Sequence, residues 1–199
     1  MNLTLASVSD LLRVTLTDPA EAVRRLVGLG LPMQARLIAF ALVVVLSVLL
    51  TQILILVMPM GAGAAWGGLM HNPLGAAAVQ AGTVLMFTTG ISVVGGWFGG
   101  RARFDDALLL MVWLEFVLFV FQLVQVVLSL ILPPVALIFG FLSVIVFFWL
   151  LVSFTAVLNG FSNRVKVLAG VLATFFAAAF LFALLATLLG FGPAEFGNV

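Results

Sequence analysis

Four polar side chains are spaced along one long apolar segment, and their types make them the residues best suited to chemistry in this chain. They are Glu115, Gln122, Gln125 and Ser129. At about 100° per residue, a helix would hold all four within roughly 80° of one another, as one polar stripe. An acid at mid-span costs on the order of 2.5–3.5 kcal/mol to insert into a bilayer, so Glu115 requires a hydrogen-bond partner or a water-filled cavity.

This polar stripe has two interpretations. One is a proton or cation step inside a helix bundle, as in a small transporter or channel. The other is a set of structural hydrogen bonds between helices, which we favour because transporters usually carry more intramembrane charge or broken helices in matching halves. The candidate partners for Glu115 are Gln52, Gln80, Thr83, Thr88 and Thr89, and also Arg101 or Arg103 if either folds back from the preceding turn.

Other residues with chemical potential are few. His71 is the single histidine, and no carboxylate near it in the sequence could complete a metal site. Asp105 and Asp106 are adjacent, and we expect them to cap a helix, where the macrodipole favours an anion. The chain has no cysteine and no tyrosine, and it has no nucleophile or phosphate-loop motif. We therefore expect no enzymatic activity, no cofactor and no metal site.

The composition indicates that much of the protein surface contacts lipid. Of the 199 residues, 65% are hydrophobic and 8% are charged, whereas soluble domains have roughly 45–50% and about 25%. The sequence therefore predicts an all-α, polytopic transmembrane bundle. With a net charge of +1 and no basic stripe, nucleic acid is not an expected partner. Membrane lipids are, together with other membrane proteins in a complex or a second copy of the chain.

The apolar segments predict five spans. They cover roughly residues 37–58, 74–98, 107–132, 135–158 and 167–189. The first has 22 residues, which gives ~33 Å of helix for a hydrocarbon core of about 30 Å. The second is rich in Gly and Ala, so we expect it at the centre of the bundle. Pro133 and Pro134 leave only a very short turn between the third and fourth spans.

A short helix is expected ahead of the first span. Asp18 can cap it, Pro19 suits its first position, and Glu21 lies three residues after the cap. Gly28 marks its end. Its apolar side fits either the membrane interface or the cytoplasmic ends of its own bundle, and both interpretations remain open.

Basic residues predict the topology. Of the eight Lys and Arg residues, four precede the first span, two lie between the second and third, and two lie between the fourth and fifth. The positive-inside rule then places the N-terminus in the cytoplasm and the C-terminus outside. We expect residues 1–35 to form a cytoplasmic or interfacial segment, residues 36–190 the five-helix domain, and residues 191–199 a short periplasmic tail.

Three motifs in this order resemble the Yip family of Ypt/Rab-interacting membrane proteins, in its bacterial branch. The first is Thr17-Asp18-Pro19-Ala20-Glu21-Ala22, the second is Gly99-Gly100-Arg101-Ala102-Arg103-Phe104-Asp105-Asp106-Ala107, and the third is Asn159-Gly160-Phe161-Ser162. The resemblance covers about residues 10–190. We call residues 99–106 of the second motif the family-like turn.

The resemblance implies a five-helix scaffold or accessory protein of the bacterial inner (plasma) membrane, with no assigned chemistry. Eukaryotic relatives act in vesicle traffic with Rab-type GTPases, and their longer cytoplasmic N-terminal region is missing from this sequence. We therefore do not carry that role over. The alternative from a different class is the small transporter or channel that would use Glu115.

Overall fold

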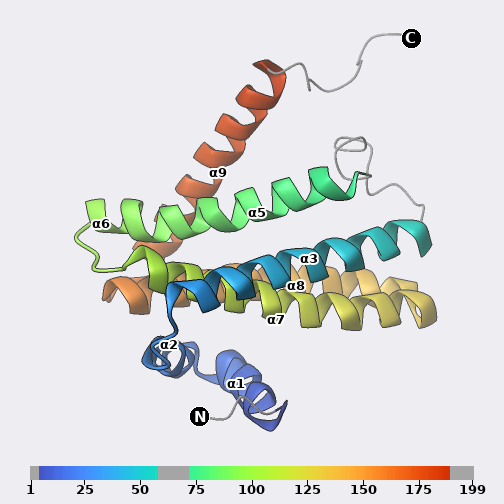
Figure 1. The fold of residues 1–199 in the computed structure, drawn as a ribbon, viewed down its shortest axis with the longest axis horizontal. Coiled ribbons are helices and arrows are strands. Elements are labelled where there is room, and N and C mark those ends of the chain that lie inside the picture. The colour runs from blue at the N-terminus through green and yellow to red at the C-terminus, as the bar shows by residue number, and fades with distance from the viewer. Residues whose placement is uncertain (1–4, 58–71, 189–199) are drawn as a thin grey trace.

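The computed structural model describes residues 5–57 and 72–188, and these residues are helical without any strand (Figure 1). The helices are α1 (Leu5–Thr17), α2 (Pro19–Gly28), α3 (Met33–Val57), α5 (Pro73–Thr89), the π-helix η1 (Gly90–Val94), α6 (Gly95–Trp97), α7 (Phe104–Ile131), α8 (Pro133–Asn159) and α9 (Arg164–Leu188). The expectations for His71 and for the tail after residue 190 lie outside the described residues.

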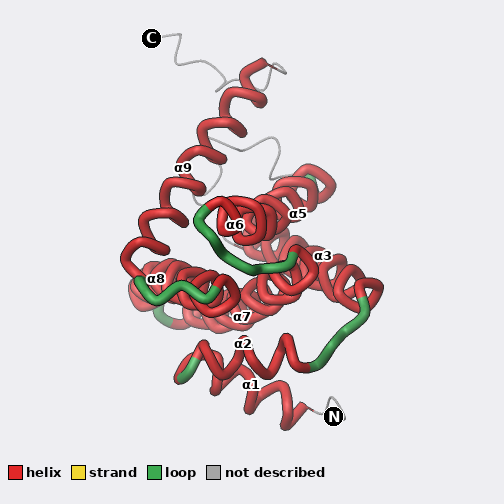
Figure 2. The backbone as a smooth tube through the Cα atoms, turned by 90° about the vertical axis from the view of Figure 1, so that its left-hand side faces the viewer, coloured by secondary structure: helices red, strands yellow, loops and turns green. Residues whose placement is uncertain are grey.

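Within residues 5–57 and 72–188, four segments are long and apolar enough to cross a membrane, so the chain is a multi-pass membrane protein. They are Met33–Ile53, Pro73–Trp97, Phe104–Ile131 and Pro133–Asn159. The fifth expected span corresponds to α9, which leans away from the others (Figures 1 and 2). The 28 residues of α7 give ~42 Å of helix, longer than a hydrocarbon core of about 30 Å, so its ends reach the headgroup level.

The centre of the bundle is α7, and our expectation for the second span was wrong. Half of the apolar window of α7 is buried, against 22% for the segment Pro73–Trp97. Six side chains of α7 have no exposed surface: Ala107, Leu108, Leu110, Met111, Leu114 and Val117. Small residues favour close helix approach only where a neighbour is present. Gly82 and Gly96 of the second span instead have open space where a Cβ would lie.

Helices α7 and α8 form a hairpin whose connection is a single residue, Leu132. The short turn expected at Pro133 is thus confirmed, and Pro133 itself begins α8. The residues at the tip, Leu130, Ile131 and Leu132, are each more than half exposed. The tip is therefore apolar.

The predicted cap of α2 is confirmed, because Asp18 accepts a hydrogen bond from the Glu21 amide at 3.0 Å. Ala22, Val23 and Leu26 are buried, where α2 packs against α7 and α8 (Figure 2). On the outer side, hydrogen bonds from Arg25 and then Arg24 lower the pKa of Glu21. Of the two open interpretations, packing against the bundle is present. On the charged side, Arg24 and Arg25 are exposed, and Arg25 is also paired with Asp10 of α1 at 3.1 Å.

Helix α1 has no counterpart among the predicted elements. Its Thr15 is fully buried, and the Trp113 indole of α7 donates a hydrogen bond to the Thr15 hydroxyl at 2.9 Å. This bond attaches α1 to the central helix. An amphipathic helix of 13 residues is short, and hydropathy alone does not distinguish it from an irregular polar segment.

Candidate functional site

Glu115 lies on α7 and is 8% exposed. The Gln80 side chain on α5 donates a hydrogen bond from Nε2 to Glu115 Oε2 at 2.6 Å. The structure thus selects Gln80 among the candidate partners. The hydroxyls of Thr83, Thr88 and Thr89 donate instead to carbonyls one turn earlier on their own helix. The acid is therefore held between two helices by an amide.

The rest of the polar stripe separates toward different neighbours. Gln122 donates to the Thr51 hydroxyl of α3 at 3.3 Å, and Gln125 lies 3.5 Å from the Ala136 carbonyl of α8. Ser129 donates to the Val126 carbonyl of its own helix at 2.6 Å. The four side chains share a face of α7, yet the structure does not bring them into one site. Their contacts tie α7 to three surrounding helices.

Residues of the family-like turn form ion pairs at the start of α7. Arg36 is only 5% exposed, and it donates to Asp106 Oδ1 at 2.9 Å and to the Leu31 carbonyl at 2.8 Å. Arg103 is exposed, and it contacts both carboxylate oxygens of Asp105 at 3.1 Å. A guanidinium from α3 thus meets the acidic first turn of α7.

The expected cap by Asp105 and Asp106 was wrong. The N-cap of α7 is Arg103, which makes no side-chain capping bond, and both aspartates lie in the first helical turn. Their charge still suits the positive end of the helix dipole. They do not cap because both lie inside the helix, where Asp105 pairs with Arg103 and Asp106 pairs with Arg36. In the sequence, Arg36 was only one of the four basic residues that precede the first span, and its pairing was not predicted.

Asn159 is named in the sequence analysis only as the first residue of the third motif, and its contacts were not predicted. It ends α8, is 3% exposed, and donates from Nδ2 to the carbonyls of Ile91 and Thr155 at 3.2 and 3.1 Å. Its Oδ1 accepts from the Ala102 amide at 3.4 Å. Because η1 is a π-helix, its backbone hydrogen bonds join residues five apart, whereas those of an α-helix join residues four apart. One asparagine therefore joins α8, η1 and the family-like turn.

The glycines around Asn159 make this contact possible. A Cβ at Gly95 would lie 2.6 Å from Asn159 Oδ1, and a Cβ at Gly100 would overlap the same oxygen. Gly99 has a φ of 85°, which favours glycine. The Gly-Gly pair of the family-like turn is thus required by the close approach of an amide side chain and by a left-handed residue.

The family model of the Yip1 domain matches residues 13–190. The chain belongs to the Yip1 family. The membership predicted from the three motifs is thereby confirmed. No curated protein and no solved structure matches the chain. Within the Yip1 domain, the second and third motifs are in direct contact, since Asn159 begins the third motif and binds Ala102 of the second.

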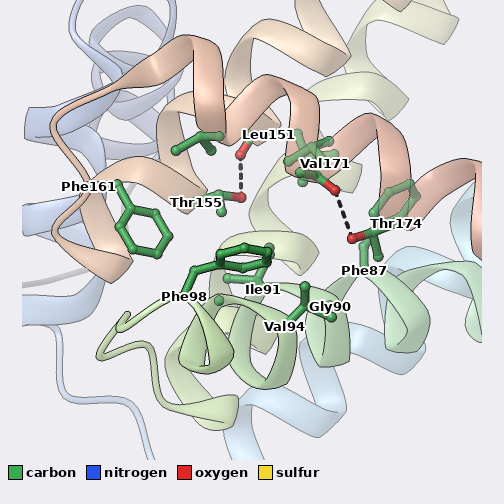
Figure 3. Close-up of a pocket in the computed structure, with 13 residues that line it drawn as sticks. Phe87, Gly90, Ile91, Val94, Phe98, Leu151, Thr155, Phe161, Val171 and Thr174 are labelled. Carbon is green, nitrogen blue, oxygen red and sulfur yellow. Dashed lines mark hydrogen bonds between the residues drawn. The ribbon is translucent and has the colours of Figure 1, made fainter.

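A cavity of about 50 Å³ lies in the Yip1 domain between η1, α8 and α9. Figure 3 shows Phe98 and Phe161 at one end, with Thr155 and Thr174 along its wall. Both threonine hydroxyls donate to carbonyls of their own helices, at 2.7 and 2.8 Å. The lining therefore offers mainly apolar surface. Glu115 and the rest of the polar stripe do not line it.

Proposed function

We propose that this Yip1 protein is a non-enzymatic scaffold or accessory protein of the bacterial inner membrane, acting through helix–helix and lipid contacts. The observation that carries the proposal is the bond between Gln80 and Glu115. It supports a structural role for Glu115, the acid placed deep in a span. The motifs that resemble the bacterial branch support the choice of membrane.

The exposed surface of the spans supports the same proposal. Large apolar side chains of α8 face outward, and Leu137, Ile138, Phe141 and Ile145 are each at least 65% exposed. Such a surface fits lipid tails or another membrane helix. Partners for it would be lipids, other membrane proteins of a complex, or a second copy of this chain. A transporter needs a polar path, and the cavity beside α9 is lined mainly by apolar groups.

Glu115→Gln tests the scaffold against the transporter. Glutamine keeps an oxygen that can accept from Gln80, so we expect unchanged folding and unchanged recovery of co-purifying membrane proteins in a gentle detergent. Proton and cation flux into proteoliposomes should equal that of empty vesicles for both proteins. A flux by the wild type that Glu115→Gln abolishes, with assembly intact, would establish the transporter instead. Recovery of the wild type without any stoichiometric protein would exclude a role as accessory subunit.

Glu115→Leu is the matched control for the structural bond. Leucine fills a similar volume but leaves the Gln80 amide without its acceptor, which costs about 1–3 kcal/mol for a buried group. A lower melting temperature for Glu115→Leu than for Glu115→Gln is therefore expected. Equal melting temperatures would show that the bond contributes nothing to the fold.

We also propose five spans with the N-terminus in the cytoplasm, in which α9 is the fifth. The starts of α3, α7 and α9 each carry basic residues, namely Arg36, Arg103 and Arg164. In an antiparallel arrangement these starts share one side of the membrane, where the positive-inside rule places them in the cytoplasm.

Cysteine labelling tests this topology, because the chain has no cysteine of its own. In sealed cells, an impermeant thiol reagent should label Asn72→Cys and a cysteine added after Val199. It should reach Arg103→Cys only after permeabilisation. If the added cysteine is labelled only after permeabilisation, like Arg103→Cys, α9 does not cross the membrane. If Arg103→Cys is labelled in sealed cells and the other two cysteines are not, the proposed orientation is wrong.

A further inference from the structure

Three cations on two adjacent turns have no acidic partner in the part of the chain that the structure describes. Arg101 belongs to the family-like turn, and Arg164 and Lys166 begin α9; all three are exposed. The hydrogen bond between Asn159 and Ala102 holds the two turns together. Within the described residues, four other arginines are paired with Asp10, Glu21, Asp105 or Asp106. Only Arg13, on the separate helix α1, is similarly unpaired.

The apolar cavity lies directly against these turns. Phe98, which precedes the family-like turn, and Phe161, which precedes Arg164, both line it. From there the lining continues along α9 through Val167, Gly170 and Thr174 (Figure 3). Its volume of about 50 Å³ is far below the roughly 300–1,000 Å³ of a site for a soluble drug-sized ligand. It suits a part of one hydrocarbon chain.

We propose that this place binds an anionic phospholipid of the surrounding bilayer. The phosphate contacts Arg101, Arg164 and Lys166, and one acyl chain passes Phe98 and Phe161 to enter the cavity. Charge complementarity selects the occupant, because the basic turns lie at the headgroup level, where each Lys or Arg adds attraction to anionic lipid. The inference names the class of lipid for the lipid contacts of the proposed function. It rests on the proposed function, because the proposed topology places these two turns on the cytoplasmic side of the membrane.

The experiment measures lipid binding to the purified chain by native mass spectrometry, with phosphatidylglycerol and phosphatidylcholine as probes. The wild type should prefer phosphatidylglycerol by about 100-fold, the effect of three charges at about 1 kcal/mol each. Changing Arg101, Arg164 and Lys166 together to Gln should weaken phosphatidylglycerol binding by about 100-fold, and leave phosphatidylcholine unchanged. The matched control changes Arg13, Arg24 and Arg25 to Gln, which alters the net charge equally at another place and should have little effect. Equal losses in both triple variants, or equal affinity for the two lipids, would overturn the proposal.

A second variant tests the cavity. Gly170 lines the cavity, and a Cβ there meets no atom within 4 Å. Gly170→Ala is therefore expected to keep the fold, and Gly170→Leu adds the bulk that should compete with an acyl chain. Gly170→Leu should weaken long-chain phosphatidylglycerol more than a short-chain form. Equal effects on both lengths would exclude the acyl-chain contact, and full competition by inorganic phosphate would show a free-anion site. If the variants lose phosphatidylglycerol binding but still recover co-purifying membrane proteins, the scaffold role stands without its lipid site. If phosphatidylglycerol binds but no membrane protein co-purifies, only the scaffold role is excluded.

Discussion

Gly100→Ala should lower the stability of the folded protein by about 2–3 kcal/mol, as overpacking of a tight contact does. The new Cβ would overlap Asn159 Oδ1 and lie 2.8 Å from Asn159 Cβ. Rotating the amide away cannot relieve the clash without giving up its bond to the Ile91 carbonyl. Thermal unfolding in detergent, followed by tryptophan fluorescence, should show a fall of about 5–10 °C at this chain length.

Gly96→Ala is the control for Gly100→Ala. It lies in the neighbouring helix α6, and a Cβ there meets no atom within 4 Å. Its melting temperature should match the wild type. In the double variant Gly100→Ala with Asn159→Ala, the overlap with the amide group is removed and only the 2.8 Å contact with the Cβ of residue 159 remains, so the two losses should be less than additive. Additive losses would show that Gly100 and Asn159 act independently.

Arg36→Met is expected to destabilise the protein by about 3 kcal/mol, the lower end of the range for breaking a buried ion pair. Methionine keeps much of the apolar volume but leaves Asp106, whose side chain is 17% exposed, without its partner. The Leu31 carbonyl loses its donor as well. A lower midpoint in the same thermal unfolding assay is the measurement.

The double variant Arg36→Met with Asp106→Leu should recover much of that loss, because replacing both members of a buried pair by apolar residues is often neutral. Arg24→Ala serves as the control. It breaks an exposed pair with Glu21, and exposed pairs contribute little. If Arg24→Ala and Arg36→Met lowered the midpoint equally, burial of the Arg36 pair would have no energetic consequence.

Much of the fold follows from local rules that the sequence states directly. Runs of apolar residues long enough to cross a membrane predicted the segments that became α3, α5 to α6, α7 and α8. The cap at Asp18 and the turn at Pro133 followed from backbone chemistry at single residues. These features depend on near neighbours in the chain, which is why a single sequence sufficed.

The arrangement of the helices depended on pairs of distant residues. Glycine content suggested the second span as the centre, but Gly82 and Gly96 face open space, and the branched and long side chains of α7 fill the core instead. Arg36 and Asp106 are separated by 70 positions, and Asn159 and Ile91 by 68. No local pattern distinguishes a buried arginine at a helix start from an exposed one.

The candidate site was predictable to the same extent. Helical periodicity placed Glu115 and the two glutamines on one face, and Gln80 was among the partners considered for the acid. Periodicity fixes an angle on one helix and says nothing of which helix lies opposite. The split of the polar stripe among α3, α5 and α8 therefore appears only in three dimensions.

The hairpin of α7 and α8 has a consequence for how the chain enters a membrane. Its tip is made of Leu130, Ile131 and Leu132, and the following residues are two prolines. No ionised side chain lies between Glu115 and Arg164. The two helices can therefore be inserted together, tip first, without carrying any charged group across the hydrocarbon layer. Insertion of this hairpin would bring only an apolar connection of one residue, Leu132, to the far side.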